Sequence, residues 1–149
     1  MKTRIGVISS CGGHLTEVRD LLPPDADLEY FFVINDRTKA LDGTGFRTYF
    51  VSHSERDWKF GLNLIEAWRI LRRERPAMLI STGAGVIVPF AIIGRLFLGT
   101  RVVFVETITR LSEPSLTARL MYVLAHDFYF QWESLKRYFP KGHCIEFPA

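Results

Sequence analysis

The stretch "VISSCGGHLTEV", Val7 to Val18, changes character in its middle. It begins as an apolar, β-branched run, passes through two serines, a cysteine and two glycines, and continues with helical spacing. A strand, a short turn and a helix in this order form the repeating unit of a parallel α/β sheet. The stretch therefore predicts a strand over Ile5–Ser9, a turn over Ser10–Gly13 and a helix from His14 onward.

This first turn has the composition of a phosphate-binding loop. Ligands of such sheets bind beyond the carboxyl ends of the strands. Glycines let a ligand approach the backbone, and the helix dipole favours an anion by about 0.3–1 kcal/mol. The dinucleotide fingerprint GxGxxG and the Walker sequence are both absent from the turn. A turn that serves only the packing of strand against helix stays open as the alternative.

The rest of the chain continues the alternation of strands and helices. Leu64, Ile65, Trp68 and Leu71 share one face of a predicted amphipathic helix. No repeat or linker interrupts the pattern, so residues 1–149 are expected to form one Rossmann-like α/β domain, a parallel sheet with helices on both faces. The predicted strands are Arg4–Ser9, Leu28–Ile34, Arg47–Val51, Met78–Ser81, Arg101–Val105, Asp127–Gln131 and Cys144–Phe147.

Composition limits the classes of partner. The chain is 48% hydrophobic and 23% charged, as in a globular protein, and its net charge of +3 includes no long basic run. Nucleic acid is therefore not expected as a partner. Cys11 and Cys144 are too isolated for a disulfide framework or a metal site, so two reduced thiols and no metal are expected.

The sequence predicts contact with a membrane surface rather than a span. The apolar run Ile5–Ile8 is shorter than the roughly 7–15 residues of a signal-peptide core. The apolar segment Val86–Leu98 contains Arg95 and falls short of the roughly 20 residues of a spanning helix. Residues 56–119 carry ten basic and five acidic side chains, which favours an anionic surface. A solvated basic face without a membrane role is the alternative.

Two further turns repeat the theme of the first. In "LISTGAGVIVP" a strand runs into Thr82–Gly85 and then into an apolar helix. In "VVFVETITRLSEPSLTARL" a buried strand ends at Glu106, Arg110 follows, and a helix is expected to start near Ser112 or Ser115. A carboxylate at this edge can accept hydrogen bonds from a sugar or a base. The alternative is a surface glutamate paired with Arg110.

Taken together, these motifs resemble a known family. "SSCGGHLTEV", "STGAGVIVP", "FVETITRLSEPSLTARLMYVLAHDFYFQWESLKRYFP" and "IEFPA" are similar, in order, to the PssD-type family of bacterial polysaccharide biosynthesis and to its eukaryotic relative, the anchoring subunit of asparagine-linked glycosylation. More distantly, the turns resemble the N-terminal, acceptor-binding domain of MurG-type GT-B glycosyltransferases. The resemblance implies that fold.

The resemblance also implies a function. The chain would be the acceptor-binding, membrane-associating subunit of a two-component inverting glycosyltransferase. That enzyme would transfer a sugar from a UDP-sugar to a polyprenyl-diphosphate-linked saccharide in exopolysaccharide or capsule biosynthesis. A separate PssE-like subunit is expected to bind the donor, because the second Rossmann-like half is not found before Ala149, and no cofactor is expected. The expected location is peripheral, at the cytoplasmic face of the membrane. Many members begin with a transmembrane helix, whereas here a strand starts close to Met1.

The family's site maps onto single residues of this chain. His14 is the expected catalytic base, since imidazole exchanges protons near neutral pH; binding of the acceptor diphosphate or simple ordering of the turn are its alternatives. The expected acceptor-binding residues are Gly12, Gly13, Thr16, Gly83, Gly85, Glu106 and Arg110. Two other functions stay open: a nucleotide-binding reductase or regulatory module, with Asn35-Asp36 supplying an acid, and a scaffold without site chemistry.

Overall fold

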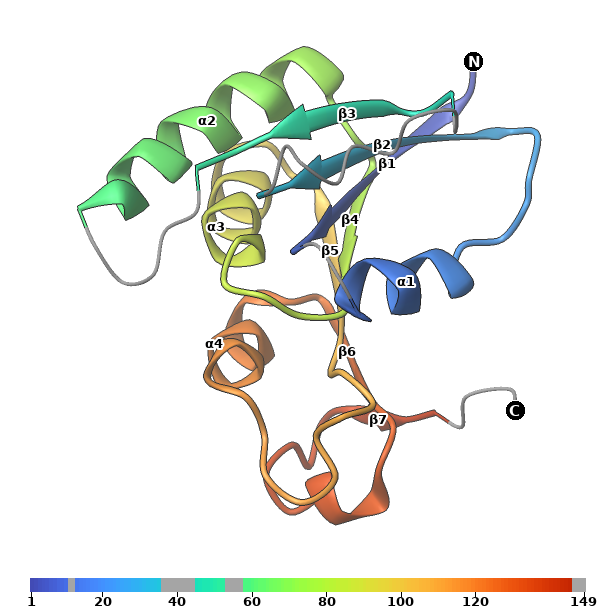
Figure 1. The fold of residues 1–149 in the computed structure, drawn as a ribbon, viewed down its shortest axis with the longest axis vertical. Helices are drawn as coiled ribbons and strands as arrows, with labels where there is room; N and C mark the ends of the chain where they lie inside the picture. Colours follow the sequence, from blue (N-terminus) through green and yellow to red (C-terminus); the bar gives the residue numbers. More distant parts are fainter. Residues whose placement is uncertain (11–12, 36–44, 53–57, 146–149) are drawn as a thin grey trace.

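In the computed structural model the sheet has seven parallel strands in the order β3-β2-β1-β4-β5-β6-β7 (Figure 1). The structure describes residues 1–10, 13–35, 45–52 and 58–145. The strands are β1 (Thr3–Ser9), β2 (Leu28–Ile34), β3 (Arg47–Phe50), β4 (Met78–Ser81), β5 (Arg101–Val105), β6 (Asp127–Phe130) and β7 (His143–Cys144).

The predicted strands are confirmed with small differences at their ends. β3 and β6 each end one residue earlier than predicted, β1 and β7 each begin one residue earlier, and β7 ends at Cys144, so Ile145 lies outside it. Residues 146 and 147 of the last predicted strand lie outside the described residues. The near-continuous burial of β1, β2 and β5 explains why apolar runs alone predicted them, because both faces of a parallel sheet are covered.

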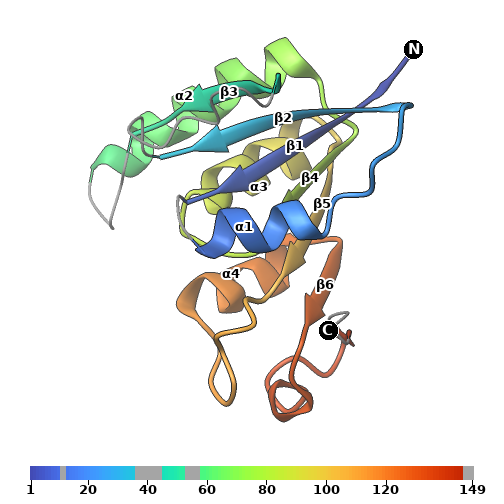
Figure 2. The same cartoon turned by 45° about the vertical axis from the view of Figure 1, so that its right-hand side comes forward.

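Helices cover both faces of the sheet, as predicted. The helices are α1 (Gly13–Asp20), α2 (Lys59–Glu74), α3 (Ile87–Phe97) and α4 (Leu116–Leu124). Figures 1 and 2 show α1 on one face and α2, α3 and α4 together on the other. Alternate residues of β2 serve the two cores: Phe31 and Val33 pack toward α2–α4, and Phe32 and Ile34 pack with Leu15 of α1.

α2 buries only part of its predicted apolar face. Its buried residues are Asn63, Ala67, Leu71 and Glu74, whereas Ile65 is 50% and Trp68 37% exposed. Of the apolar residues predicted to share one face, Leu71 is therefore buried, and Ile65 and Trp68 are not. Two polar residues, Asn63 and Glu74, are buried on the inner side of the helix, and Glu74 has polar partners there.

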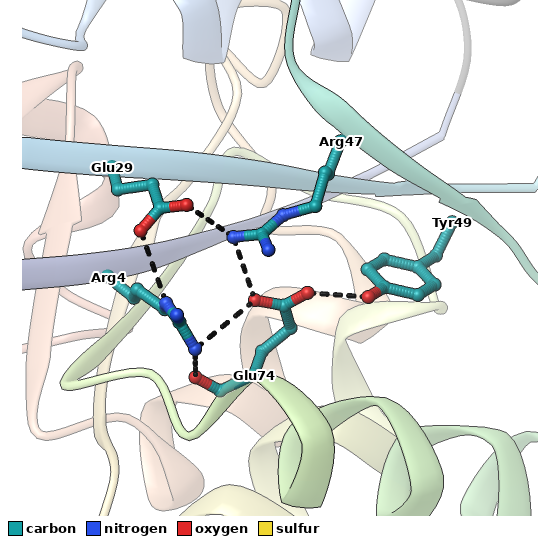
Figure 3. Close-up of polar contacts among 5 residues, drawn as sticks. All are labelled: Arg4, Glu29, Arg47, Tyr49 and Glu74. Atoms are coloured by element: carbon teal, nitrogen blue, oxygen red, sulfur yellow. Dashed lines mark hydrogen bonds and ion pairs between the residues drawn. The ribbon is translucent and has the colours of Figure 1, made fainter.

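Glu74 joins α2 to three strands at the amino edge of the sheet (Figure 3). Its carboxylate, 1% exposed, accepts a hydrogen bond from the Tyr49 hydroxyl and lies 3.2 Å from Arg47 Nη2. Arg4 Nη1 donates to the Glu74 carbonyl oxygen at 2.9 Å, and Glu29 bridges both arginines. Burial and the Glu74 carboxylate raise the pKa of Tyr49. This cluster lies at the edge opposite to the ends where ligands of such sheets bind.

No helix in the described ranges combines the length and the apolar character needed to cross a bilayer.

Candidate functional site

A large cavity of the described chain lies over the carboxyl edge of the sheet. Its volume is about 770 Å³. Its lining comes from the ends of three strands (Ser10, Asn35, Ser52), the first turns of α2 (Phe60, Asn63), the β4–α3 turn and α3 (Ala84, Gly85, Val86, Val88), and Arg110 with the start of α4 (Ser115, Leu116, Thr117, Leu120), together with His14. A smaller cavity of about 200 Å³ shares His14, Ala84, Arg110, Ser115 and Thr117 with it.

His14 occupies the junction of the two cavities. Its half-buried ring lies against Gly83 so closely that a Cβ built on Gly83 would be 2.6 Å from His14 Cε1. The Thr82 hydroxyl donates to the His14 carbonyl oxygen at 2.8 Å, which ties the first turn of α1 to the β4–α3 turn. His14 Nδ1 is buried with no hydrogen-bond partner among the described residues. The first two predicted turns therefore meet at one imidazole.

The β4–α3 turn presents bare backbone to the cavities. Gly83 has a φ of 146°, and Ala84 has a φ of 71°, a left-handed conformation that costs a non-glycine residue about 1–2 kcal/mol. A Cβ on Gly85 would meet nothing within 4 Å. α3 begins here without a side-chain cap and without an acidic residue in its first turn. The N–H groups of Ile87 and Val88 donate to the carbonyl oxygens of Ala84 and Gly85, so the start of α3 favours an anion in the cavity through its dipole.

The side chain of Glu106 is hydrogen-bonded to the start of α4. It is fully buried, and its carboxylate accepts hydrogen bonds from the backbone N–H groups of Thr107 (3.1 Å) and Ser115 (2.9 Å) and from the Ser115 hydroxyl (3.1 Å). The Ser115 hydroxyl oxygen in turn accepts from Ala118 N at 3.0 Å and caps α4, which confirms the predicted start of this helix. The surface alternative for Glu106 is wrong, and its direct contact with a sugar stays a prediction.

Arg110 is the cation of the site. It is exposed, lines both cavities, and has no carboxylate within ion-pair distance in the described part of the chain. Its backbone N–H donates to Thr107 O at 3.1 Å, which closes the turn that follows β5. The guanidinium is therefore available to an anionic group in either cavity.

The structure brings together most of the residues predicted for the site. His14, Gly83, Glu106 and Arg110 line the smaller cavity, and His14, Gly85 and Arg110 line the larger one. Gly13 and Thr16 are exposed on α1 and belong to neither lining, and Gly12 lies outside the described residues.

Sequence reasoning missed two polar residues of the larger cavity, Ser52 and Asn63, and named Asn35 only with Asp36, which lies outside the described residues, as an acid for nucleotide binding. Ser52 comes shortly after β3, and Asn35 directly follows β2, a position that marks the carboxyl edge. Asn63 is 1% exposed within α2, where no local signal distinguishes it from a solvated asparagine. In the described residues no group of three or more His, Cys, Asp or Glu side chains is arranged to hold a metal ion.

Comparison with known proteins agrees with this geometry. Residues 47–146 match the family described as "Oligosaccharide biosynthesis protein Alg14 like". The chain belongs to this Alg14-like family. Curated relatives include the UDP-N-acetylglucosamine transferase subunit ALG14 of Homo sapiens, 30% identical over 78 residues, and that of Candida albicans, 35% identical over 68 residues. The matches cover 49% and 42% of this chain but only 36% and 31% of those relatives.

Solved structures show the same fold. MurG of Acinetobacter baumannii has a TM-score of 0.74 at 13% identity, over 96% of this chain and 44% of MurG. A UDP-GlcNAc 2-epimerase of Methanocaldococcus jannaschii has a TM-score of 0.71 at 14% identity, over 93% of this chain and 42% of the epimerase. The predicted Rossmann-like fold, equivalent to one domain of a GT-B protein, is confirmed.

Proposed function

We propose that this member of the Alg14-like family is the acceptor-binding and membrane-associating subunit of a two-component glycosyltransferase. Its acceptor would be a polyprenyl-diphosphate-linked saccharide in exopolysaccharide or capsule biosynthesis. The observation that carries the proposal is the lining of the larger cavity, which combines bare backbone and a cationic side chain with exposed apolar side chains. An acceptor with a diphosphate between a saccharide and a hydrocarbon chain has the same order of chemical groups.

The polar part of the lining of the larger cavity fits a diphosphate. The start of α3 (Gly85, Val86), the exposed Arg110 and Thr117 all line the larger cavity, and among the described residues no acidic side chain lines it. Glu106 borders the smaller cavity, but its charge is satisfied by N–H and hydroxyl donors. A charge-assisted hydrogen bond to a phosphate oxygen contributes about 1.5–3 kcal/mol.

The apolar part of the lining of the larger cavity fits a hydrocarbon chain. Phe60 of α2 and Leu116 and Leu120 of α4 line the cavity and are 37%, 53% and 48% exposed. Apolar side chains of this size on an open rim favour an apolar ligand, at about 25 cal/mol per Å² of surface removed from water.

The outer face of α2 is a second surface, apolar and basic, that suits contact with a membrane. Trp58, just before α2, and Leu62 and Ile65 within it lie on the face opposite the buried residues, and all are exposed. Arg69 and Arg72 lie on the same face, because their spacing from Ile65 is four and seven residues. Further along α2, Trp68 packs edge-on against the exposed Phe97 of α3. Exposed tryptophan and basic side chains together favour an anionic bilayer surface. We place this contact at the cytoplasmic face.

The proposed reaction divides the chemistry between two polypeptides. A hydroxyl of the acceptor attacks the anomeric carbon of the UDP-sugar, the glycosidic bond forms as the bond to the UDP oxygen breaks, and the configuration inverts. His14 is the candidate to take the hydroxyl proton, and a PssE-like subunit would hold the UDP-sugar. The name of the human relative, a transferase subunit, supports this division. Contact with the acceptor diphosphate, without proton transfer, is the alternative role of His14, which lines both cavities.

Binding of farnesyl diphosphate tests the proposal. The chain should bind it more tightly than farnesol, inorganic pyrophosphate or NADH, measured by calorimetry. Gly85→Val adds a side chain where the fold leaves open space, so it should weaken binding at least about tenfold with an unchanged melting temperature. Gly61→Val, equally unhindered but outside the cavity, is the matched control. Equal affinity for farnesol and farnesyl diphosphate, or no effect of Gly85→Val, would contradict the proposal.

A further inference from the structure

Glu17 is a buried carboxylate on α1 that neither cavity uses. It is 9% exposed, and no cation is paired with it in the described part of the chain. Its Oε1 instead accepts two hydrogen bonds, from Ile108 N at 2.8 Å and from Gln131 Nε2 at 2.7 Å. Burying a charge is costly unless donors replace the lost water. The donors here come from two segments about a hundred residues away in the sequence.

Those donors belong to the loop that carries Arg110 and to the segment behind it. Gln131 Nε2 also donates to the Glu106 carbonyl oxygen at 3.2 Å, and Trp132 Nε1 donates to the Ile108 carbonyl oxygen at 2.7 Å. Ser134 then donates to the carbonyl oxygen of Leu111, further along the loop. The backbone between β5 and α4 is thus fastened on the α1 side by Glu17 and on its other side by residues 131–134.

The same short helix supports the other turns. His14 and Glu17 are three residues apart, so their side chains leave α1 on neighbouring positions. The His14 carbonyl oxygen accepts from Thr82, and the Glu17 carboxylate accepts from Ile108. α1 therefore links the β4–α3 turn to the β5–α4 loop at the point where both border the smaller cavity.

We propose that Glu17 is a positioning residue: it fixes the loop of residues 107–111 so that Arg110 faces the cavities. Its benefit for ligand binding rests on the proposed function, whereas its effect on the loop does not. Without Glu17, Ile108 N loses its acceptor and Gln131 Nε2 keeps only the Glu106 carbonyl oxygen, so the backbone before Arg110 is released on that side. A single oxygen accepts both bonds, so an amide oxygen in the same place can replace it.

The test compares Glu17→Ala with Glu17→Gln in the full chain. Amide hydrogen exchange of residues 107–111 and the affinity for farnesyl diphosphate are measured for each folded variant. Glu17→Ala should raise exchange at Ile108 at least about tenfold and weaken binding about tenfold, and Glu17→Gln should restore most of both. Glu113→Ala removes an exposed glutamate from the same loop and should change neither. If Glu17→Ala does not fold, Gln131→Met removes the second donor with little change in size and should raise the same exchange.

The outcomes separate the two proposals. Unchanged exchange at Ile108 in Glu17→Ala would overturn the positioning role, whatever the ligand results. Raised exchange with undiminished affinity would overturn its contribution to binding. Failure of Glu17→Gln to restore affinity while it restores protection would show that the carboxylate charge acts on the ligand, which also contradicts a positioning role. If the wild-type chain itself does not bind farnesyl diphosphate, the proposed function fails, and the exchange measurement still decides whether Glu17 holds the loop.

Discussion

His14 and Gly83 define the site at the scale of single residues. The His14 imidazole occupies the space that a side chain on Gly83 would fill. A glycine at position 83 is therefore needed to make room for His14, as well as for any ligand. This reading differs from the sequence argument, in which glycines in both turns served the approach of phosphate. Gly85 keeps that role, since it lines the larger cavity and open space surrounds its missing Cβ, whereas Gly13 is equally open but lines neither cavity.

We therefore predict that Gly83→Ala mimics a change of His14. The added methyl must displace the ring, and the φ of 146° disfavours alanine in addition, so the melting temperature should also fall. In the reconstituted enzyme, His14→Ala should lower kcat about 10²–10⁴-fold if the imidazole is the base. If it only contacts phosphate, the loss of about 1.5–3 kcal/mol should appear in acceptor KM. Steady-state kinetics of both variants, with circular dichroism as the folding control, would measure this; wild-type kinetics for His14→Ala would exclude both roles.

Glu106 shows which properties of a residue can be predicted from the sequence. Its place at the end of a buried strand predicted its position at the carboxyl edge correctly. Its hydrogen bonds depend on Ser115, nine residues later, and on the path of the loop between them. No local pattern encodes that path. The same holds for Glu17, whose partners are fixed only when α1, β5 and β6 are assembled.

At the scale of elements, α2 was predicted as an amphipathic helix correctly, but not all of its apolar residues lie on the buried side. Apolar spacing identifies an amphipathic helix, but it assumes that the apolar side is the inner one. In α2 the inner side contains Asn63 and Glu74, and the outer side carries Ile65 and Trp68. An apolar outer face is suited to contact with the apolar part of a membrane.

We predict that α2 mediates binding to anionic vesicles. The chain should pellet with phosphatidylglycerol liposomes at low salt and be released as salt rises, because screening weakens the attraction of Arg69 and Arg72. The double variant Arg69→Glu and Arg72→Glu should abolish pelleting. Arg19→Glu with Lys141→Glu changes the net charge equally at exposed positions away from α2 and should still pellet. Equal loss in both double variants would mean that overall charge, rather than this face, is responsible.

The pair of Arg101 and Asp127 predicts how stability responds to acid. Arg101 Nη2 donates to Asp127 at 2.9 Å between the starts of β5 and β6, and the hydrogen bonding of Arg101 lowers the pKa of Asp127 below the ordinary value of 3.8. Because the pKa of Asp127 is lower in the folded state, the ionised carboxylate stabilises the protein at pH values above the ordinary pKa. This contribution disappears as the pH falls through the pKa of the folded state. Asp127→Asn should therefore lower the melting temperature at pH 7, with a difference from wild type that shrinks toward pH 3. A constant difference at both pH values would contradict this linkage.

At the scale of the whole molecule, the order of elements was sufficient to predict the fold. Alternating apolar strands and helices have few ways to pack, and right-handed crossovers reduce these further. The position of the site followed from the same rule, because ligands bind at the carboxyl edge of such sheets. The polar end of the larger cavity did not follow, since Asn35, Ser52 and Asn63 meet there only through the arrangement of β2, β3 and α2.

The central claim is that this domain supplies the acceptor half of a transferase whose donor half is on another polypeptide. The most direct measurement is transfer of radiolabelled sugar from a UDP-sugar to a polyprenyl-diphosphate-linked saccharide, with the 149-residue chain alone and mixed with a purified PssE-like subunit. We predict no transfer by either chain alone and sustained transfer by the pair, with the rate lowered by Gly85→Val and not by Gly61→Val. Sustained transfer by this chain alone, or a stable pair that transfers no sugar, would contradict the account.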